Sequence, residues 1–219
     1  MVQYIPLPKG SVRLLRLLPH TGSSSRIECQ LITCPLLHSK RAHSYEALSY
    51  VWGSDKNLQC IYLDGHQLSV RANLYQALSH LRDEFVQRIL WIDALCINQE
   101  DDKEKGHQVQ SMAKIYAKAS RVIVWLGVSA DDSDLALGSV LRAAQERNAD
   151  SDSAADDARN QQLSFMPSGQ QQQPVDPEVS RQKILKLLER EWFQRIWVRT
   201  IQLSFFPMFY FLFLFLFFS

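Results

Sequence analysis

The sequence predicts an α/β fold: a mainly parallel sheet with helices on both faces, preceded by an N-terminal β-hairpin element. Apolar segments of strand length alternate with amphipathic helical segments from residue 45 onward, which is typical of a parallel sheet covered by helices. Two of these segments, 89–97 and 121–127, are apolar almost throughout, as in strands buried on both faces. With 219 residues, 46% of them hydrophobic, the chain is long enough for a core of ordinary size.

The first strands come before the main domain. Residues 12–18 are short and apolar and predict a strand or a short lead-in helix, and residues 27–33 alternate between apolar and polar and predict a strand that stops at Pro35. The aromatic-rich segment 45–52 predicts a buried strand that ends at Gly53.

A hairpin and a helix follow. Asp64-Gly65 separates the segments 58–63 and 66–70, and this dipeptide supplies the positive φ angles of a type I′ turn. Asn73 is expected to cap the next helix. One apolar face of that helix would comprise Leu74, Ala77, Leu78, Leu81 and Phe85.

The apolar segment 89–97 predicts the next strand and contains one acid, Asp93. An acidic start at 100–104 suits the positive end of a helix dipole, so we expect a helix over 103–119. Its buried stripe would comprise Val109, Met112, Tyr116 and Ala119. The β-branched segment 121–127 predicts a strand. A helix over 131–147 would then direct Leu135, Val140, Leu141 and Ala144 inward.

Composition divides the chain further. Residues 1–44 form the lead-in strands and 45–148 the domain core. Residues 149–177, rich in Asp, Ser and Gln, have too few large apolar side chains to offset the cost of ordering, and predict a disordered insertion. Residues 178–199 form a last helical block, and 200–219 an aberrant apolar tail.

Charge and cysteine content narrow the class of function. The net charge of +1 argues against a nucleic-acid partner. The N-terminus has no signal-peptide pattern, and the four cysteines show no paired C-x-x-C spacing. We therefore expect a cytoplasmic protein with reduced thiols and no metal site.

A functional crevice is expected beyond the carboxyl ends of the strands, namely at 52–55, 93–99 and 127–129. Asp93 either fixes the turn by accepting backbone N–H groups or contacts a ligand such as a ribose. Trp52 and Gly53 form either a flat aromatic surface on which the base of a ligand stacks, with a glycine that lets the ligand approach closely, or a strand end that is covered by a core aromatic side chain. Asn98 and Gln99 either cap the following helix or bind the ligand.

Two further groups have a catalytic and a structural interpretation. Cys96 and His107 would make a nucleophile and base, but a thiol flanked by Leu and Ile is usually part of the core. Asp101, Asp102 and Glu104 would make a metal site, but a solvated helix N-terminus explains them better.

Several ordered blocks resemble the fungal heterokaryon incompatibility (HET) domain. They are YEALSYVWG at 45–53, NLYQAL at 73–78, LWIDALCINQ at 90–99 and RVIVWLG at 121–127, with a further block at 190–198. The resemblance implies a role in fungal non-self recognition and cell death, carried out through association with other protein domains or with itself. No cofactor is implied.

The same blocks are similar, more distantly, to Toll/interleukin-1 receptor (TIR) domains, which implies a flavodoxin-like sheet. Some TIR domains cleave NAD with one glutamate after a tryptophan. In this chain that tryptophan matches Trp197, and Ile201 stands where the glutamate is expected, so no catalytic residue is predicted. NAD would be a substrate only of a complete homologue with the acid, since the cleavage needs a carboxylate beside the ribose.

The tail at 203–219 is composed mainly of Phe and Leu. It is shorter than the roughly 20 residues that span a membrane, and it lacks a basic flank at its end. Phe, Leu, Ser and Pro, which make up most of the tail, all have codons made only of pyrimidines, which favours a truncated or mis-spliced gene model over a tail anchor. A membrane partner is expected only if this tail is genuine.

Overall fold

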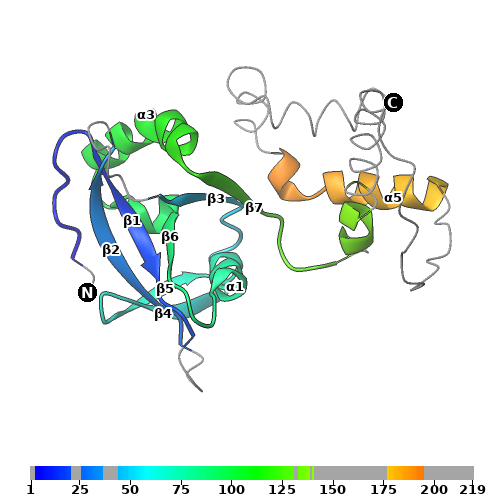
Figure 1. The fold of residues 1–219 in the computed structure, drawn as a ribbon, viewed down its shortest axis with the longest axis horizontal. Helices are drawn as coiled ribbons and strands as arrows, with labels where there is room; N and C mark the ends of the chain where they lie inside the picture. Colours follow the sequence, from blue (N-terminus) through cyan, green and yellow to red (C-terminus); the bar gives the residue numbers. More distant parts are fainter. Residues whose placement is uncertain are drawn as a thin grey trace, which may run out of the picture. The chain divides into compact units, whose positions relative to one another are not determined.

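The structure is a computed structural model that describes residues 3–20, 26–36, 44–130, 133–138, 140 and 177–194. It comprises two compact units, Met1–Gly127 and Val128–Ser219. The first unit holds the whole described sheet, and Figure 1 shows it with the strands and the helices α1 and α3 labelled.

A seven-stranded sheet with the order β5-β4-β2-β1-β6-β3-β7 forms the first unit. Its strands are β1 (Ser11–Leu17), β2 (Glu28–Pro35), β3 (Glu46–Tyr50), β4 (Leu58–Leu63), β5 (His66–Arg71), β6 (Arg88–Trp91) and β7 (Arg121–Trp125). The helices of this unit are α1 (Ala72–Leu81), α2 (Asp93–Cys96) and α3 (Asp102–Lys118). The predicted α/β class is confirmed.

The predicted parallel arrangement is found at the β7 end of the sheet and again between β2 and β4. β3 pairs in parallel with β6 on one side and with β7 on the other. The earliest of these three strands thus lies between the two that follow, which is how a flavodoxin-like sheet begins. Taken whole, however, the sheet is mixed rather than mainly parallel, because β1 pairs antiparallel with both β2 and β6, and β4 pairs antiparallel with β5.

The N-terminal strands are part of this same sheet. The segment predicted at 12–18 is the strand β1 (Ser11–Leu17) and not a helix, and it lies between β2 and β6. Trp91 at the end of β6 lies edge-on against Tyr116 of α3, with ring centroids 5.4 Å apart. Its neighbours Leu90 and Ile92 point to the opposite face and are fully buried as well, so both faces of β6 are covered.

The predicted β4–β5 hairpin is confirmed. Leu63 pairs with His66 across a two-residue turn. Asp64 has a φ of 50° and Gly65 a φ of 77°, which are the positive angles of a type I′ turn.

Helix α1 begins and ends earlier than the sequence suggests. Arg71 occupies the N-cap position without a side-chain cap, so the prediction that Asn73 caps the helix is wrong. The helix ends at Leu81, and Asp83 then accepts hydrogen bonds from the backbone N–H groups of Phe85 and Val86. Because this turn redirects the chain, Phe85 is 81% exposed and does not join the apolar face.

The buried face of α3 is also shifted relative to the prediction. Tyr116 is buried as expected, but Val109 is 51% exposed and Gln108 is buried instead. Polar contacts fix this face: Gln108 donates to the Ser11 carbonyl, and the Tyr116 hydroxyl donates to the Leu48 carbonyl. Apolar periodicity could not predict a buried glutamine.

The second unit contains a helical segment at 133–138, α5 (Pro177–Leu188) and the 3-10 helix η1 (Glu191–Gln194). Leu135 is 54% exposed rather than inward, since Ser133 and Ala136 take the buried positions. Leu141, Ala144, the predicted insertion, Trp197 and the tail at 200–219 lie outside the described residues. Among the described helices, none has the length and apolarity needed to cross a membrane.

Candidate functional site

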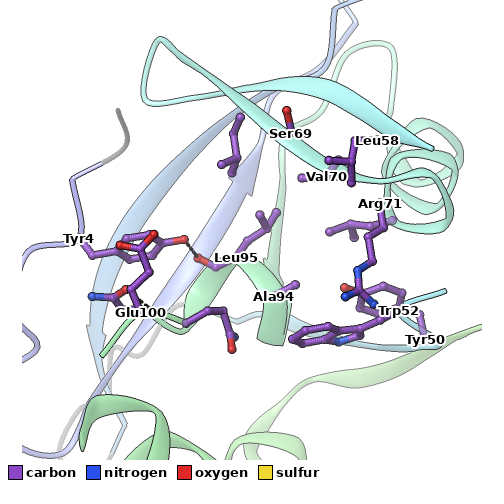
Figure 2. A pocket seen from close by; sticks show the side chains of 14 residues that line it. Tyr4, Tyr50, Trp52, Leu58, Ser69, Val70, Arg71, Ala94, Leu95 and Glu100 are labelled. Atoms are coloured by element: carbon purple, nitrogen blue, oxygen red, sulfur yellow. Dashed lines mark hydrogen bonds between the residues drawn. The ribbon is translucent and has the colours of Figure 1, made fainter. Parts of the chain in front are cut away.

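A pocket of about 340 Å³ lies at the carboxyl ends of β3 and β6, beneath the β4–β5 hairpin. Figure 2 shows Trp52 and Tyr50 on one side, Ala94 and Leu95 of α2 across from the hairpin, and Tyr4 at the far end. The lining residues are Tyr4, Tyr50, Trp52, Leu58, Leu68, Ser69, Val70, Arg71, Leu74, Ala94, Leu95, Asn98, Gln99 and Glu100. Two of the three predicted strand ends therefore meet at one pocket.

Asp93 connects the two strand ends. The indole Nε1 of Trp52 donates to Asp93 Oδ2 at 3.0 Å, and the Ala94 N–H donates to Oδ1 at 2.7 Å. The Asp93 carbonyl accepts from the Gln99 side chain at 3.0 Å. This carboxylate therefore fixes the turn after β6, as one interpretation expected, and it also fixes the orientation of the indole. Contact of Asp93 with a ligand stays a prediction.

Gly53 turns the chain after β3 with a φ of 73°, a conformation that favours glycine. A Cβ at this position would meet the Asn73 Cβ at 3.5 Å, which is an ordinary contact, so the backbone angle is what requires glycine. The Gly53 carbonyl accepts from Arg71 Nη1 at 2.8 Å, and the Arg71 guanidinium lies 5.2 Å from the centre of a Trp52 ring. A cation is thus held against the indole at the rim of the pocket.

The Asn98–Glu100 segment lies between α2 and α3. The Asn98 side chain accepts from the Glu100 N–H at 3.2 Å, and Asp101 caps α3 by accepting from two backbone N–H groups. Asn98 and Gln99 both line the pocket and hydrogen-bond to the loop backbone, but the prediction that they cap the following helix is wrong, because Asp101 occupies the N-cap of α3. Ligand binding by these amides stays a prediction.

Behind this segment lies a buried ion pair between Arg13 of β1 and Glu104 of α3. Arg13 Nη2 donates to Glu104 Oε2 at 2.9 Å, and Glu104 Oε1 accepts from the Asn98 N–H at 2.9 Å. Burial alone would raise the pKa of Glu104, but the hydrogen bonds from Arg13 and Asn98 and the charge of Arg13 outweigh it, so the pKa lies below its ordinary value. The expectation that Glu104 belongs to a solvated helix start is wrong, because Arg13 pairs with it.

The third predicted strand end is not part of the pocket. Asn73 links the carboxyl ends of β3 and β7: its Nδ2 donates to the Val51 carbonyl at 2.6 Å, and its Oδ1 accepts from Trp125 Nε1 at 2.9 Å. The residues after β7 are absent from the pocket lining.

Cys96 has the structural role expected for it. It is 1% exposed, and burial raises its pKa to about 12, so the thiolate needed for nucleophilic attack is not available near neutral pH. Cys29 is similar, because burial raises its pKa to about 12 as well. Within the described residues, no cluster of His, Cys, Asp and Glu is suited to a metal ion.

Comparison with known proteins identifies the family. The model of the heterokaryon incompatibility protein (HET) family matches residues 45–200, which include the strands, loops and helices that build most of the pocket. The chain belongs to the HET family. Heterokaryon incompatibility protein 6, OR allele, of Neurospora crassa is 36% identical to this HET domain over 152 residues, which are 64% of this chain and 22% of that protein. The chain thus spans about a fifth of the length of this relative. No solved structure matches the chain.

Only three lining residues, Trp52, Asn98 and Gln99, were among the predicted site residues; Tyr4, Arg71 and Glu100 are among those that were not. Arg71 is the last residue of β5 and directly precedes α1, so its place at a strand end was a signal in the sequence that it could belong to the site. Tyr4 comes from a segment without regular structure, and its hydroxyl donates to the Leu95 carbonyl at 3.2 Å. No pattern in the sequence indicates that pairing.

Proposed function

We propose that this HET domain acts in heterokaryon incompatibility, in fungal non-self recognition and the cell death that follows it. It does so by associating with other protein domains or with a second copy of itself. The family match and the name of the Neurospora crassa relative support the biological role.

The observation that carries the association mechanism is the composition of the pocket. The pocket is lined mainly by apolar and aromatic side chains, and its charged groups, Arg71 and Glu100, stand at the rim. The carboxylate of Asp93, beside the pocket, already accepts a hydrogen bond from the Trp52 indole. Apolar surface with a charged rim is the usual composition of a recognition site. The thiol of Cys96, next to the lining residue Leu95, is buried and protonated at neutral pH.

A second candidate function is cleavage of NAD at the nicotinamide bond. Glu100 favours it, because this carboxylate lines a pocket at the carboxyl ends of parallel strands. Against it stands Ile201, which occupies the sequence position where the related TIR domains carry the glutamate. We expect this chain to be inactive, and incubation of the purified protein with NAD, followed by measurement of nicotinamide, tests this. Sustained nicotinamide release that is lost on Glu100→Gln would establish the enzyme instead.

Expression in fungal hyphae tests the association proposal. Induction of the protein is expected to arrest growth and to admit a membrane-impermeant dye. Two copies with different tags, or one copy and a partner domain, are expected to co-purify from these hyphae. Normal growth at high protein abundance, or cell death without any detectable association, would contradict the proposal.

A further inference from the structure

Strand β5 is the last strand of the described sheet, and its outer edge can be assigned from the hydrogen bonds of its neighbour. The N–H groups of Tyr62 and Asp64 bind the β2 side, at the carbonyls of Ile27 and Cys29, at 2.8 Å and 2.9 Å. Successive residues of a strand direct their backbone groups to opposite sides. The backbone groups of Leu63, Ile61 and Gln59 therefore face β5.

The β5 residues paired with those three are His66, Leu68 and Val70. The N–H and C=O groups of the intervening Gln67 and Ser69 therefore point away from β4. No backbone hydrogen bond reaches either residue from elsewhere in the described part of the chain. Two consecutive pairs of donors and acceptors are thus open along one edge, which is a ready template for another strand.

The pocket lies directly beside this edge. Leu68 and Val70 of β5 line it together with Leu74, Tyr50 and Leu95, and its volume of about 340 Å³ accommodates one large apolar side chain with space remaining. Figure 2 shows Ser69 and Val70 along the strand that borders the pocket. A strand added at β5 would therefore direct alternate side chains toward an apolar cavity.

The charges at the rim are arranged at opposite ends. Figure 2 shows Arg71 beside Trp52 at one end and Glu100 beside Tyr4 at the other. Arg71 forms no ion pair with any residue that the structure describes, and it contacts the Gly53 carbonyl with one N–H group and Trp52 with the guanidinium face. The Glu100 carboxylate likewise has no partner among the described residues. An acid therefore suits the Arg71 end, and a base suits the Glu100 end.

We propose that β5 and this pocket bind an extended peptide segment of a partner protein by strand addition, with the side-chain order acid, large apolar, base on the face that meets the pocket. Main-chain hydrogen bonds to Gln67 and Ser69 supply the register, and Arg71 selects the acid. The proposal rests on the proposed function, because it names the kind of partner through which the domain associates. A small anionic ligand is the competing occupant, and it would use Arg71 and the pocket without the β5 edge.

The probe is the synthetic peptide acetyl-Thr-Asp-Thr-Phe-Thr-Lys-Thr-amide, whose Asp, Phe and Lys share one face when extended. It is titrated into the full ¹⁵N-labelled chain. We expect saturable binding, shifts of the Gln67 and Ser69 amide signals, and slower hydrogen exchange at both. The Asp→Asn peptide should bind at least about tenfold more weakly, because it loses a charge-assisted hydrogen bond.

Two protein variants separate the edge from the pocket. Ser69→Pro removes an N–H that points away from β4, so the hairpin is retained while strand addition is blocked. It should weaken binding by about tenfold or more, as should Arg71→Gln, whereas Lys105→Gln on the exposed face of α3 should not change it. Far-ultraviolet circular dichroism checks that each variant folds, and the exchange data on the unmodified chain test the edge even if Ser69→Pro does not fold.

No binding at ~1 mM peptide would overturn the inference. So would equal affinity for the Asn peptide, or undiminished binding by folded Ser69→Pro, which would point to a ligand that uses the pocket alone. The hyphal assay is independent of these results. Cell death with no peptide binding refutes only the strand-addition inference, and peptide binding without cell death or association refutes the proposed function.

Discussion

The buried ion pair between Arg13 and Glu104 offers the sharpest test of how the pocket is held together. The Arg13 side chain is 3% exposed and the Glu104 side chain 11% exposed. Arg13 also donates to the carbonyls of Ile5 and Cys96, and its guanidinium lies 5.0 Å from the centre of the Tyr4 ring. One arginine thus connects β1, the N-terminal segment, the end of α2 and the start of α3.

Glu104→Ala leaves this guanidinium buried without its counter-charge and leaves the Asn98 N–H without its acceptor. Breaking a buried pair costs about 3–5 kcal/mol, and the residual exposure of Glu104 places the expected loss near the lower limit, about 3 kcal/mol. Glu104→Gln keeps one acceptor oxygen and should cost about half as much, ~1.5 kcal/mol. The double variant Arg13→Met/Glu104→Leu removes both charges and should be more stable than Glu104→Ala.

Urea unfolding followed by far-ultraviolet circular dichroism measures these differences, and the single variants Arg13→Met and Glu104→Leu with the double variant form a thermodynamic cycle. The pH dependence provides a second readout. Since the folded pKa of Glu104 lies below its ordinary value of 4.5, the contribution of the pair is complete above that pH and is lost as the pH falls through the folded pKa. A loss under 1 kcal/mol for Glu104→Ala, or the same acid sensitivity in Glu104→Gln as in the unmodified chain, would refute the reasoning.

Three further predictions concern the frame around the site. Tyr45→Phe removes a hydroxyl that donates to a main-chain carbonyl of α3, and urea unfolding should show a loss of about 1 kcal/mol; no loss would mean that the carbonyl finds another donor. Gly65→Ala places a side chain at a φ of 77° and should cost about 1 kcal/mol by thermal unfolding, and an unchanged midpoint would contradict the type I′ turn. Iodoacetamide at about pH 8 should modify the exposed Cys60 while Cys29 and Cys96, whose pKa burial raises to about 12, stay unmodified in the mass spectrum; early modification of either would contradict the burial.

The sequence predicted the parts of the fold that depend on local patterns. The strand β7 and the β4–β5 hairpin follow from a β-branched run and a turn dipeptide. The segment 89–97 was expected to be one strand, but β6 ends at Trp91 and Asp93 begins α2, so only the place of the acid just after the strand was predicted. The two strand ends that meet at the pocket were also predicted, because carboxyl ends of parallel strands share one edge.

The errors arise where a long-range polar contact overrides a local preference. Asn73 suits an N-cap, yet its amide bridges β3 and β7 instead. Glu104 suits a solvated helix start, yet Arg13, 91 residues earlier, pairs with it. Likewise, the antiparallel placement of β1 beside β6 decides the mixed character of the sheet, and strand pairing order is not encoded in any one segment. Such contacts depend on the assembled fold.

We propose that the pocket at the ends of β3 and β6 carries the recognition function of this HET domain. Trp52→Leu removes the indole that bonds Asp93 and supports Arg71, while Phe85→Ser changes an exposed side chain outside the pocket lining and serves as the matched control. The most direct measurement is dye uptake by hyphae that express each form at equal abundance. We predict that Trp52→Leu abolishes cell death and Phe85→Ser preserves it. Undiminished cell death with folded, abundant Trp52→Leu would contradict the claim.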